Sequence, residues 1–289
     1  MDILISCNDN YGMPTMVMLT SLVCNNPCIP GEHTVYMLES ELSDEWSNKI
    51  ESLLRDHCWG YVRLHVPTDL FSAARTKPYI SKETYYRLIA YRFLPENVRT
   101  VLWLDSDILV RKDLGAIFDI SLDKEMAAAC GYGHAMQVII SDNAKRLGMS
   151  HPETYFNAGV MLMDLPECRN AISEDSIMQI ATAETTSSFM FPGQDTVNLI
   201  FDGKVKILDY RIYNCMIHCI ETAEDLQYAK DNAAIVHFAG EAKPWKFDDI
   251  HFSDEWAEWY RVCFGETAVL KRMSYFRLKA LFSRQRGIN

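Results

Sequence analysis

Short apolar runs alternate with stretches of helical periodicity through the first quarter of the chain. Residues 3–7 form a short apolar run that predicts a buried strand, and residues 35–38 and 62–66 predict a second and a third strand. Between them, apolar residues recur at helical spacing after Pro14, and residues 43–54, with Asp44 and Glu45 in the first turn, predict a second helix. Repeated alternation of strand and helix predicts an α/β fold, with a mostly parallel central sheet covered by helices on both faces.

The most hydrophobic of the predicted strands, residues 101–104, runs directly into Asp105, Ser106 and Asp107. In open α/β sheets the ligand crevice lies beyond the carboxyl ends of the strands. Both carboxylates are therefore expected at the binding edge of the sheet.

Composition and charge narrow the class of protein. The 289 residues, of which 48% are hydrophobic and 23% charged, are ordinary for a globular chain. We expect one domain over residues 1–250, because no repeat or linker interrupts it, and a helical, basic and aromatic tail over residues 251–289. A net charge of -11 argues against nucleic acid as a partner, since an acidic surface repels phosphate backbones.

The cysteines indicate a reducing compartment. There are 9 of them, scattered among mostly apolar neighbours, as in cytosolic proteins. Cys215 and Cys219 flank His218, but no second pair at ligand spacing completes a zinc site, so packing is the favoured interpretation. The sequence has neither the pattern of a signal peptide nor the roughly 20 apolar residues of a membrane-spanning helix. The predicted localisation is cytoplasmic.

Asp105 and Asp107 form a candidate metal site. One residue separates them, so at a turn both carboxylates can converge on one ion. Two hard oxygen ligands suit Mg²⁺ or Mn²⁺, which complete their coordination with substrate phosphates and water. A lone Asp-x-Asp triplet is usually a solvated turn, but the fully apolar strand before this one favours metal binding.

A second segment offers an imidazole, a glycine and a lysine. The apolar residues 235–239 include His237, Gly240 permits close approach of a ligand to the backbone, and Lys243 follows. Alone, the segment would be interpreted as a core histidine with a surface lysine. Beside the two aspartates it predicts a third cation ligand and a phosphate donor.

Two further stretches, residues 155–163 and 192–198, carry amides beside small residues. The first leads into a strand, and either stretch alone would be interpreted as a turn. Amides donate to and accept from sugar hydroxyls without adding charge. Such stretches, which include Asn157 and Gln194, carry the chemistry that a sugar-binding site uses.

Six motifs occur in one order along residues 1–250. They are residues 8–11, 86–88, 104–110, 156–160, 194–195 and 237–245. Together they resemble family 8 of the retaining glycosyltransferases, which includes bacterial lipooligosaccharide galactosyltransferases and glycogenin. Six co-linear motifs are far more specific than any one of them.

The resemblance implies a nucleotide-diphospho-sugar transferase domain of the GT-A type, with Mn²⁺ or Mg²⁺ bound by Asp105, Asp107 and His237. It also implies a UDP-hexose donor and a saccharide or glycolipid acceptor. The expected donor-binding residues are Ser6, Asn8, Asn10, Arg87, Asp105, Ser106, Asn157, Ala158, Gln194, Gly240 and Lys243. Gln194, Arg87 and Lys243 are the expected catalytic residues, with Gln194 beneath the anomeric carbon and the two cations at the diphosphate.

An amide is a poor nucleophile, so Gln194 favours a front-face route over a covalent intermediate. In that route a diphosphate oxygen accepts the proton of the incoming hydroxyl. Gly193 stands where the galactosyltransferases carry a carboxylate, and Gly131 lies near the position of another sugar-contacting aspartate. Glucose and galactose both remain open as the transferred sugar.

The tail offers a candidate membrane contact. Residues 271–284 place apolar side chains against basic ones at helical spacing, as in helices that lie on anionic membranes. Peripheral attachment to the inner face of the cytoplasmic membrane is one interpretation. A helix packed on the domain is the other.

Three other functions remain open. A metal-dependent nucleotide-sugar hydrolase would use the same cation site to activate water and would turn over without an acceptor. A non-catalytic sugar-nucleotide sensor would bind the donor, although the three metal ligands and Gln194 are all present. Self-glucosylation, as in glycogenin, would require an acceptor among the 14 tyrosines.

Overall fold

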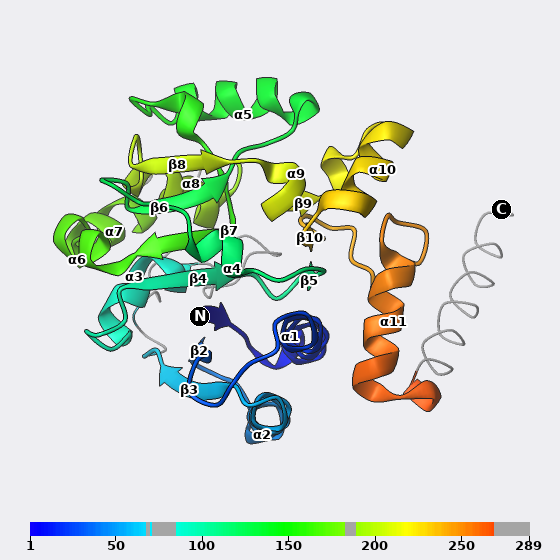
Figure 1. The fold of residues 1–289 in the computed structure, drawn as a ribbon. Helices are drawn as coiled ribbons and strands as arrows, with labels where there is room; N and C mark the ends of the chain where they lie inside the picture. Colours follow the sequence, from blue (N-terminus) through cyan, green and yellow to red (C-terminus); the bar gives the residue numbers. More distant parts are fainter. Residues whose placement is uncertain (68–69, 71–84, 183–188, 269–289) are drawn as a thin grey trace, which may run out of the picture.

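The computed structural model describes residues 1–67, 70, 85–182 and 189–268. Its centre is a sheet whose strands lie in the order β3-β2-β1-β4-β7-β6-β8 (Figure 1). The strands are β1 (Asp2–Ser6), β2 (Thr34–Glu39), β3 (Gly60–His65), β4 (Thr100–Leu104), β6 (Ala127–Cys130), β7 (Asn157–Asp164) and β8 (Val205–Leu208). All pairings are parallel except those of β7, which runs antiparallel to both β4 and β6. The predicted α/β fold with a mostly parallel sheet is confirmed.

Helices cover both faces of the sheet. The longer ones are α1 (Gly12–Asn25), α2 (Asp44–Asp56), α3 (Tyr86–Phe93), α5 (His134–Arg146), α6 (Leu165–Ala171), α7 (Glu174–Thr182), α8 (Pro192–Ile200), α10 (Ala223–Asn232) and α11 (Ser253–Phe264). The short ones are η1 (Asp9–Tyr11), α4 (Gly115–Phe118), η3 (Pro152–Thr154), α9 (Tyr210–Tyr213) and η5 (Ile217–Cys219). Among the described residues, no helix has the length and apolarity needed to cross a bilayer.

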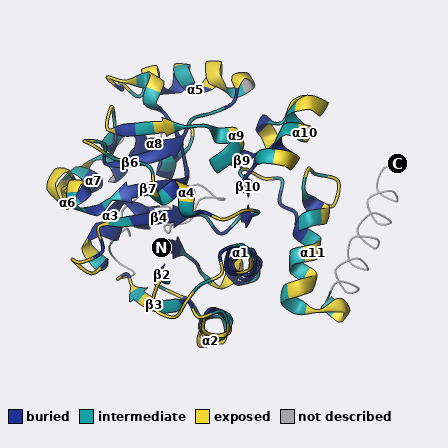
Figure 2. Ribbon diagram, viewed as in Figure 1, coloured by how far each residue is buried: buried dark blue, intermediate teal, exposed yellow. Residues whose placement is uncertain are grey.

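The strands divide their side chains between two cores. Leu4 of β1 belongs to the core that includes side chains of α3, α6, α7 and α8, whereas its neighbours Ile3 and Ile5 belong to the core that includes side chains of α1 and α2. In β4, Trp103 belongs to the first core, and Leu102 to the second. This period of two places apolar residues on both faces of each central strand, which is why these segments appear as unbroken apolar runs. Figure 2 shows the sheet buried throughout its centre.

A second, three-stranded sheet carries part of the candidate site. It consists of β5 (Ile108–Val110), β10 (Ile235–His237) and β9 (Cys215–Met216), in the order β5-β10-β9. The antiparallel register of β5 and β10 pairs Ile108 with His237. Because Ile108 directly follows Asp107, this register brings His237 beside the carboxylates.

Helix α11 packs against α1 through a largely aromatic face. Trp256 is 1% exposed, and its ring stacks on that of Tyr260 at 5.5 Å and lies 5.9 Å from that of Trp245. The predicted amphipathic helix at residues 271–284 lies outside the described residues. The division into residues 1–250 and 251–289 remains a prediction.

The segment 192–198, which alone would be interpreted as a turn, is instead the start of α8. Pro192 occupies the first helical position, where its missing N–H costs nothing and its fixed φ suits the helix. The side chain of Asp195 accepts a hydrogen bond from the Phe191 backbone N–H at 2.9 Å. Gln194 therefore projects from the first turn of a rigid helix rather than from a loop.

Candidate active site

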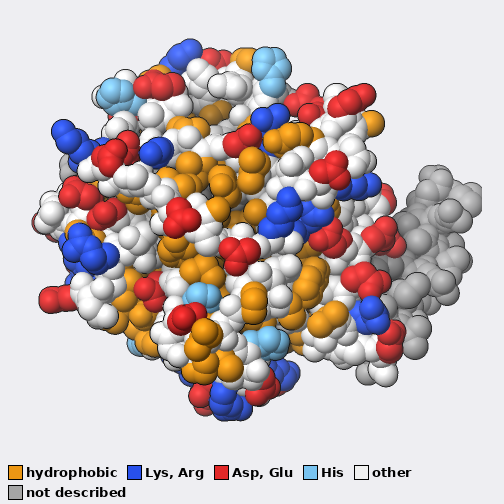
Figure 3. Space-filling model, viewed as in Figure 1, with side chains coloured by type: hydrophobic (Ala, Val, Ile, Leu, Met, Phe, Trp, Pro, Cys, Tyr) orange, Lys and Arg blue, Asp and Glu red, His pale blue; other side chains and the backbone are white. Residues whose placement is uncertain are grey.

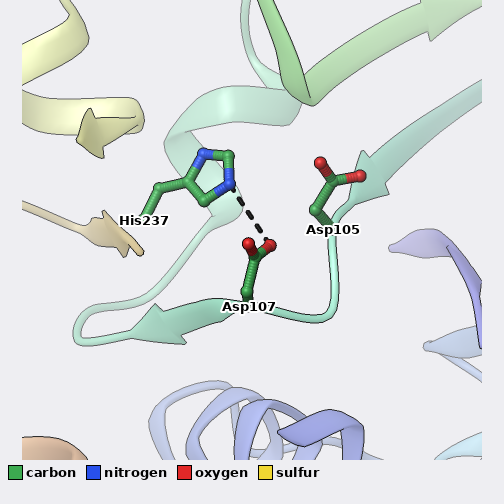
Figure 4. A group of neighbouring side chains, drawn as sticks. All are labelled: Asp105, Asp107 and His237. Carbon is green, nitrogen blue, oxygen red and sulfur yellow. Dashed lines mark ion pairs between the residues drawn. The ribbon is translucent and has the colours of Figure 1, made fainter. Parts of the chain in front are cut away.

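Asp105 and Asp107 lie in the turn that joins β4 to β5, and backbone hydrogen bonds fix this turn at both ends. The N–H of Asp105 donates to the Gly159 carbonyl at 2.9 Å, and the Asp107 carbonyl accepts from the Phe238 N–H at 2.9 Å. The turn is thus held between β7 and the end of β10. Figure 4 shows both carboxylates and the His237 ring facing a common space.

The three side chains fit a hard divalent cation. One ligand atom from each of Asp105, Asp107 and His237 lies within 4.8 Å of the others. Nε2 of His237 is 3.3 Å from a carboxylate oxygen of Asp107. Ligands of an octahedral Mg²⁺ at about 2.1 Å lie about 3.0 Å apart in cis and about 4.2 Å apart in trans. Small side-chain rotations are therefore enough to bring all three onto one ion.

Lys243 lies beside Asp107 in this site. Its ammonium group pairs with the Asp107 carboxylate and donates to the Phe238 carbonyl at 2.7 Å. Burial raises the pKa of Asp107, but the ammonium group of Lys243 and the neighbouring His237 side chain outweigh burial and hold the pKa below its ordinary value. Asp107 is therefore ionised at neutral pH, which is the form that binds a cation.

Arg87 occupies the corresponding place beside Asp105. Arg87 belongs to helix α3 and is buried. Its guanidinium lies over the Trp103 ring, 4.7 Å from the ring centroid. It donates to the Ala158 carbonyl and is 3.1 Å from the Asp105 carboxylate. The Trp103 indole also donates to Asp105, at 2.7 Å. Each aspartate thus has its own cationic neighbour, Arg87 for Asp105 and Lys243 for Asp107.

The cavity at this site has a volume of about 380 Å³. It brings together eight of the residues predicted from sequence: Arg87, Asp105, Asp107, Asn157, Ala158, Gln194, His237 and Gly240. Lys243 reaches the site through its ion pair with Asp107. Ser6, Asn8, Asn10 and Ser106 are not among the lining residues.

The Gln194 amide is held on both sides. Its oxygen accepts from the Asn157 amide at 3.2 Å and from the Ala158 N–H at 3.4 Å. Its nitrogen donates to the hydroxyls of Tyr132 at 2.6 Å and Tyr155 at 3.1 Å. Four partners leave this side chain a single orientation at the cavity wall.

Residues at the end of β1 lie next to the Asp105–Asp107 turn. The Ser106 hydroxyl donates to the Ser6 carbonyl at 3.1 Å, which ties the turn to β1. Within the described residues, the hydroxyl of Ser6 is the buried side-chain oxygen that lacks a hydrogen-bond partner. Burial, with smaller contributions from the charges of Asp107 and Asp105, raises the pKa of Tyr11 to about 12.

Seven lining residues were not predicted as site residues from the sequence: Tyr132, Met136, Gly159, Phe191, Gly193, His218 and Ala239. The closeness of His218 to two cysteines was the available signal. Cys215 and Cys219 are buried in the structure, whereas His218 faces the cavity. Among the described residues, the three-ligand cluster consists of Asp105, Asp107 and His237 and does not include His218 or these cysteines.

Figure 3 shows acidic and basic side chains interspersed on one face of the molecule, with hydrophobic side chains between them. At the cavity, Arg87 and Lys243 are each paired with an aspartate. A divalent cation bound to both aspartates would leave a net positive charge there, which suits an anionic ligand.

Comparison with known proteins agrees with this geometry. Residues 2–249 match the family model described as glycosyl transferase family 8. The chain is 26% identical over 247 residues to glycosyltransferase GlyF of Streptococcus pneumoniae, covering 84% of this chain and 56% of GlyF. It is 26% identical over 245 residues to the lipopolysaccharide 1,2-glucosyltransferase of Escherichia coli K12, covering 82% of this chain and 70% of that protein.

Among solved structures, the galactosyltransferase LgtC in complex with donor and acceptor sugar analogues has the same fold. The TM-score is 0.76 at 23% identity, covering 90% of this chain and 95% of LgtC. The chain spans just over half the length of GlyF. The family match covers most of the chain and confirms the resemblance drawn from the six motifs: the chain belongs to glycosyl transferase family 8, and it is a glycosyltransferase domain.

Proposed function

We propose that this domain is a retaining hexosyltransferase that moves glucose or galactose from a UDP-sugar to a saccharide or lipopolysaccharide-type acceptor. The observation that carries the proposal is that one site combines residues suited to a diphosphate with residues suited to a sugar. Asp105, Asp107 and His237 can hold a hard divalent cation, which together with Arg87 and Lys243 suits a diphosphate. The amides of Asn157 and Gln194 suit a sugar.

Asp105, Asp107 and His237 are proposed to bind Mn²⁺ or Mg²⁺. Such an ion neutralises the charge that develops on a diphosphate leaving group. Arg87 and Lys243 are proposed to bind the same diphosphate. Each exchanges a carboxylate partner for a phosphate oxygen, and neither needs to travel far because both already lie at the triad.

A front-face route is supported by the chemistry of the cavity wall. Gln194 is neutral, and its oxygen already accepts two hydrogen bonds. Asp195 is 0% exposed, and its oxygens accept hydrogen bonds from Tyr155, Asn143 and Phe191. The carboxylates among the described lining residues are the two proposed cation ligands. No lining carboxylate is then free to act as a nucleophile beneath the sugar, so the leaving diphosphate is the proposed proton acceptor for the incoming hydroxyl.

The nucleotide is proposed to bind over the end of β1. The unpartnered Ser6 hydroxyl supplies a hydrogen bond there, and Asn8 and Asn10 of the neighbouring segment contact uracil and ribose. The Asn8 side chain accepts from the Asn10 N–H at 3.1 Å, which fixes this segment in a tight turn. Gly240, with φ of 87°, allows a phosphate to approach its backbone.

The transferred sugar and the acceptor belong to the same proposal. Relatives of this chain include lipopolysaccharide 1,2-glucosyltransferases of Escherichia coli and a lipopolysaccharide 1,3-galactosyltransferase of Salmonella typhimurium. Both hexoses therefore remain candidates, and a lipopolysaccharide-type acceptor fits a cytoplasmic enzyme that contacts the inner membrane face through residues 271–284.

The test is donor cleavage by the purified protein. With Mn²⁺, UDP-glucose or UDP-galactose is incubated in separate reactions, with and without a lipopolysaccharide core acceptor, and UDP release is measured. The matched controls are Asp105→Asn and Asp107→Asn, which keep the side-chain shape and remove the charge. We expect acceptor-stimulated release with one donor, and loss of release in both variants.

Other results separate the alternatives. Fast release that an acceptor does not change would replace the transferase by a nucleotide-sugar hydrolase. Stabilisation by a donor without any release would indicate a binding protein. Retention of anomeric configuration in the product, measured by proton NMR, tests the stereochemistry, and inversion would refute that part of the proposal.

A further inference from the structure

Asn214 joins the cation site to the sugar-binding amides. It directly follows α9, is 0% exposed, and lies between His237 and Asn157. Its side-chain oxygen is 2.9 Å from Nδ1 of His237, and its amide nitrogen donates to the Asn157 side-chain oxygen at 2.9 Å. The oxygen and the nitrogen of this fully buried amide are thus both hydrogen-bonded to residues of the proposed site.

Asp195, at the far end of the same hydrogen-bond chain, determines which atom donates and which accepts in each of these hydrogen bonds. A carboxylate can only accept, so the Tyr155 hydroxyl donates to it, and the Tyr155 oxygen is then left to accept from the Gln194 amide nitrogen. The Gln194 oxygen must therefore accept from the Asn157 amide.

The same order of donors and acceptors continues as far as His237, the proposed cation ligand. With its nitrogen donating to Gln194, Asn157 presents its oxygen, which accepts from the Asn214 amide and from the Gly159 N–H at 3.0 Å. Asn214 then presents its own oxygen to His237, so Nδ1 of the imidazole must carry a proton.

A neutral histidine with a proton on Nδ1 has its lone pair on Nε2. That nitrogen is the one that faces Asp107, at 3.3 Å. A divalent cation binds an unprotonated ring nitrogen, and a hydrogen bond from the other nitrogen fixes the tautomer and the ring orientation.

We propose that Asn214 is a positioning residue that holds His237 in the tautomer able to bind the cation, and that it couples the cation site to the sugar-binding amides Asn157 and Gln194. The inference rests on the proposed function, because it concerns the same cation site. It assigns a role to a residue that touches neither the cation nor the sugar.

Two substitutions separate the two ends of the Asn214 side chain. Asn214→Leu has similar volume and removes both hydrogen bonds. Asn214→Asp keeps an oxygen for Nδ1 of His237 but turns a second oxygen toward the oxygen of Asn157. Asn26→Leu is the matched control: Asn26 is also 0% exposed and fully hydrogen-bonded, at the end of α1, away from the cavity.

The measurement is Mn²⁺ binding in the presence of UDP, followed by loss of the free Mn²⁺ signal in electron paramagnetic resonance. We expect Asn214→Leu to weaken Mn²⁺ binding by about 10–100-fold, the usual effect of removing a partner of a metal-binding histidine. We expect Asn214→Asp to bind Mn²⁺ with close to wild-type affinity, and to bind the UDP-hexose more weakly relative to UDP than the wild type does. Asn26→Leu lowers the melting temperature and leaves Mn²⁺ affinity unchanged.

The outcomes distinguish the inference from the proposed function. Wild-type Mn²⁺ affinity in Asn214→Leu, or an equal loss in Asn26→Leu, would overturn the role of Asn214 and leave the cation site standing. Absence of Mn²⁺ binding by the wild-type protein with UDP would overturn both. If Asn214→Leu does not fold, Asn214→Asp decides: retained Mn²⁺ binding together with weaker binding of the UDP-hexose relative to UDP supports the inference, whereas lost Mn²⁺ binding, or unchanged binding of Mn²⁺ and of the UDP-hexose, overturns it.

Discussion

Gly159 of β7 is the position where the smallest change should do the most damage to the cation site. A Cβ added there would lie 2.3 Å from Cε1 and 2.9 Å from Nδ1 of His237. Carbon atoms in contact normally lie about 3.5–4.0 Å apart, so the ring would have to move by more than about 1 Å. His237 cannot move freely, because it is 2% exposed and bonded to Asn214 at 2.9 Å.

We therefore expect Gly159→Ala to remove His237 from the cation site. Metal–ligand distances tolerate deviations of only about 0.2 Å, several times less than the forced shift. Mn²⁺ affinity should fall by at least the roughly 10–100-fold seen when a supporting residue is lost. Overpacking costs about 1–3 kcal/mol, which at this chain length corresponds to a fall of about 2–5 °C in melting temperature.

The assay is titration of Mn²⁺ with UDP present, alongside thermal unfolding without ligand. Gly131→Ala is the control, since its added Cβ would be 3.6 Å from the nearest atom, a methyl of Ile207. Gly131→Ala should match the wild type in both measurements. Wild-type Mn²⁺ affinity in Gly159→Ala would show that His237 does not bind the ion, and would refute this account of the site.

Three further predictions concern the surroundings of the site. Lys243→Met should weaken UDP binding in isothermal titration by about tenfold or more, because a hydrogen bond to a charged group contributes about 1.5–3 kcal/mol; unchanged affinity would place Lys243 away from the diphosphate. Trp256→Ala should lower the free energy of unfolding, measured in urea, by about 3–5 kcal/mol, because it removes a buried ring. A change under about 1 kcal/mol, the size of a surface effect, would contradict the packing of α11. Iodoacetamide at pH 8 should label exposed Cys58 in the folded protein but Cys215 only after unfolding, because burial raises the pKa of Cys215 to about 12; equal labelling rates by mass spectrometry would contradict this.

The sequence was most informative where burial on both faces leaves a simple pattern. The strand at residues 101–104 is unbroken apolar sequence because its alternate side chains enter two different cores. Its end could therefore be recognised, and with it the position of Asp105 and Asp107 at the edge of the sheet. The start of α8 was missed because Pro192 and Gly193 resemble a turn, although a proline at the first helical position favours a helix.

Asn214 and Tyr132 could not be predicted in the same way. Each is a single polar residue whose role depends on partners far away in the sequence. Asn214 contacts His237 and Asn157, and Tyr132 contacts Gln194. No periodicity or spacing marks such residues, because tertiary contacts alone create their hydrogen-bond networks.

The direction of β7 explains how one edge of the sheet serves both the cation and the sugar. In a fully parallel sheet, only the carboxyl ends of strands would reach the binding edge. β7 runs antiparallel to β4, and its register pairs Val160 with Leu104. The first residues of β7, Asn157 and Gly159, therefore lie beside Asp105, which directly follows Leu104. Asn157 contacts Gln194 while Gly159 leaves room for the His237 ring, so a shift of β7 by one residue would disrupt both halves of the site together.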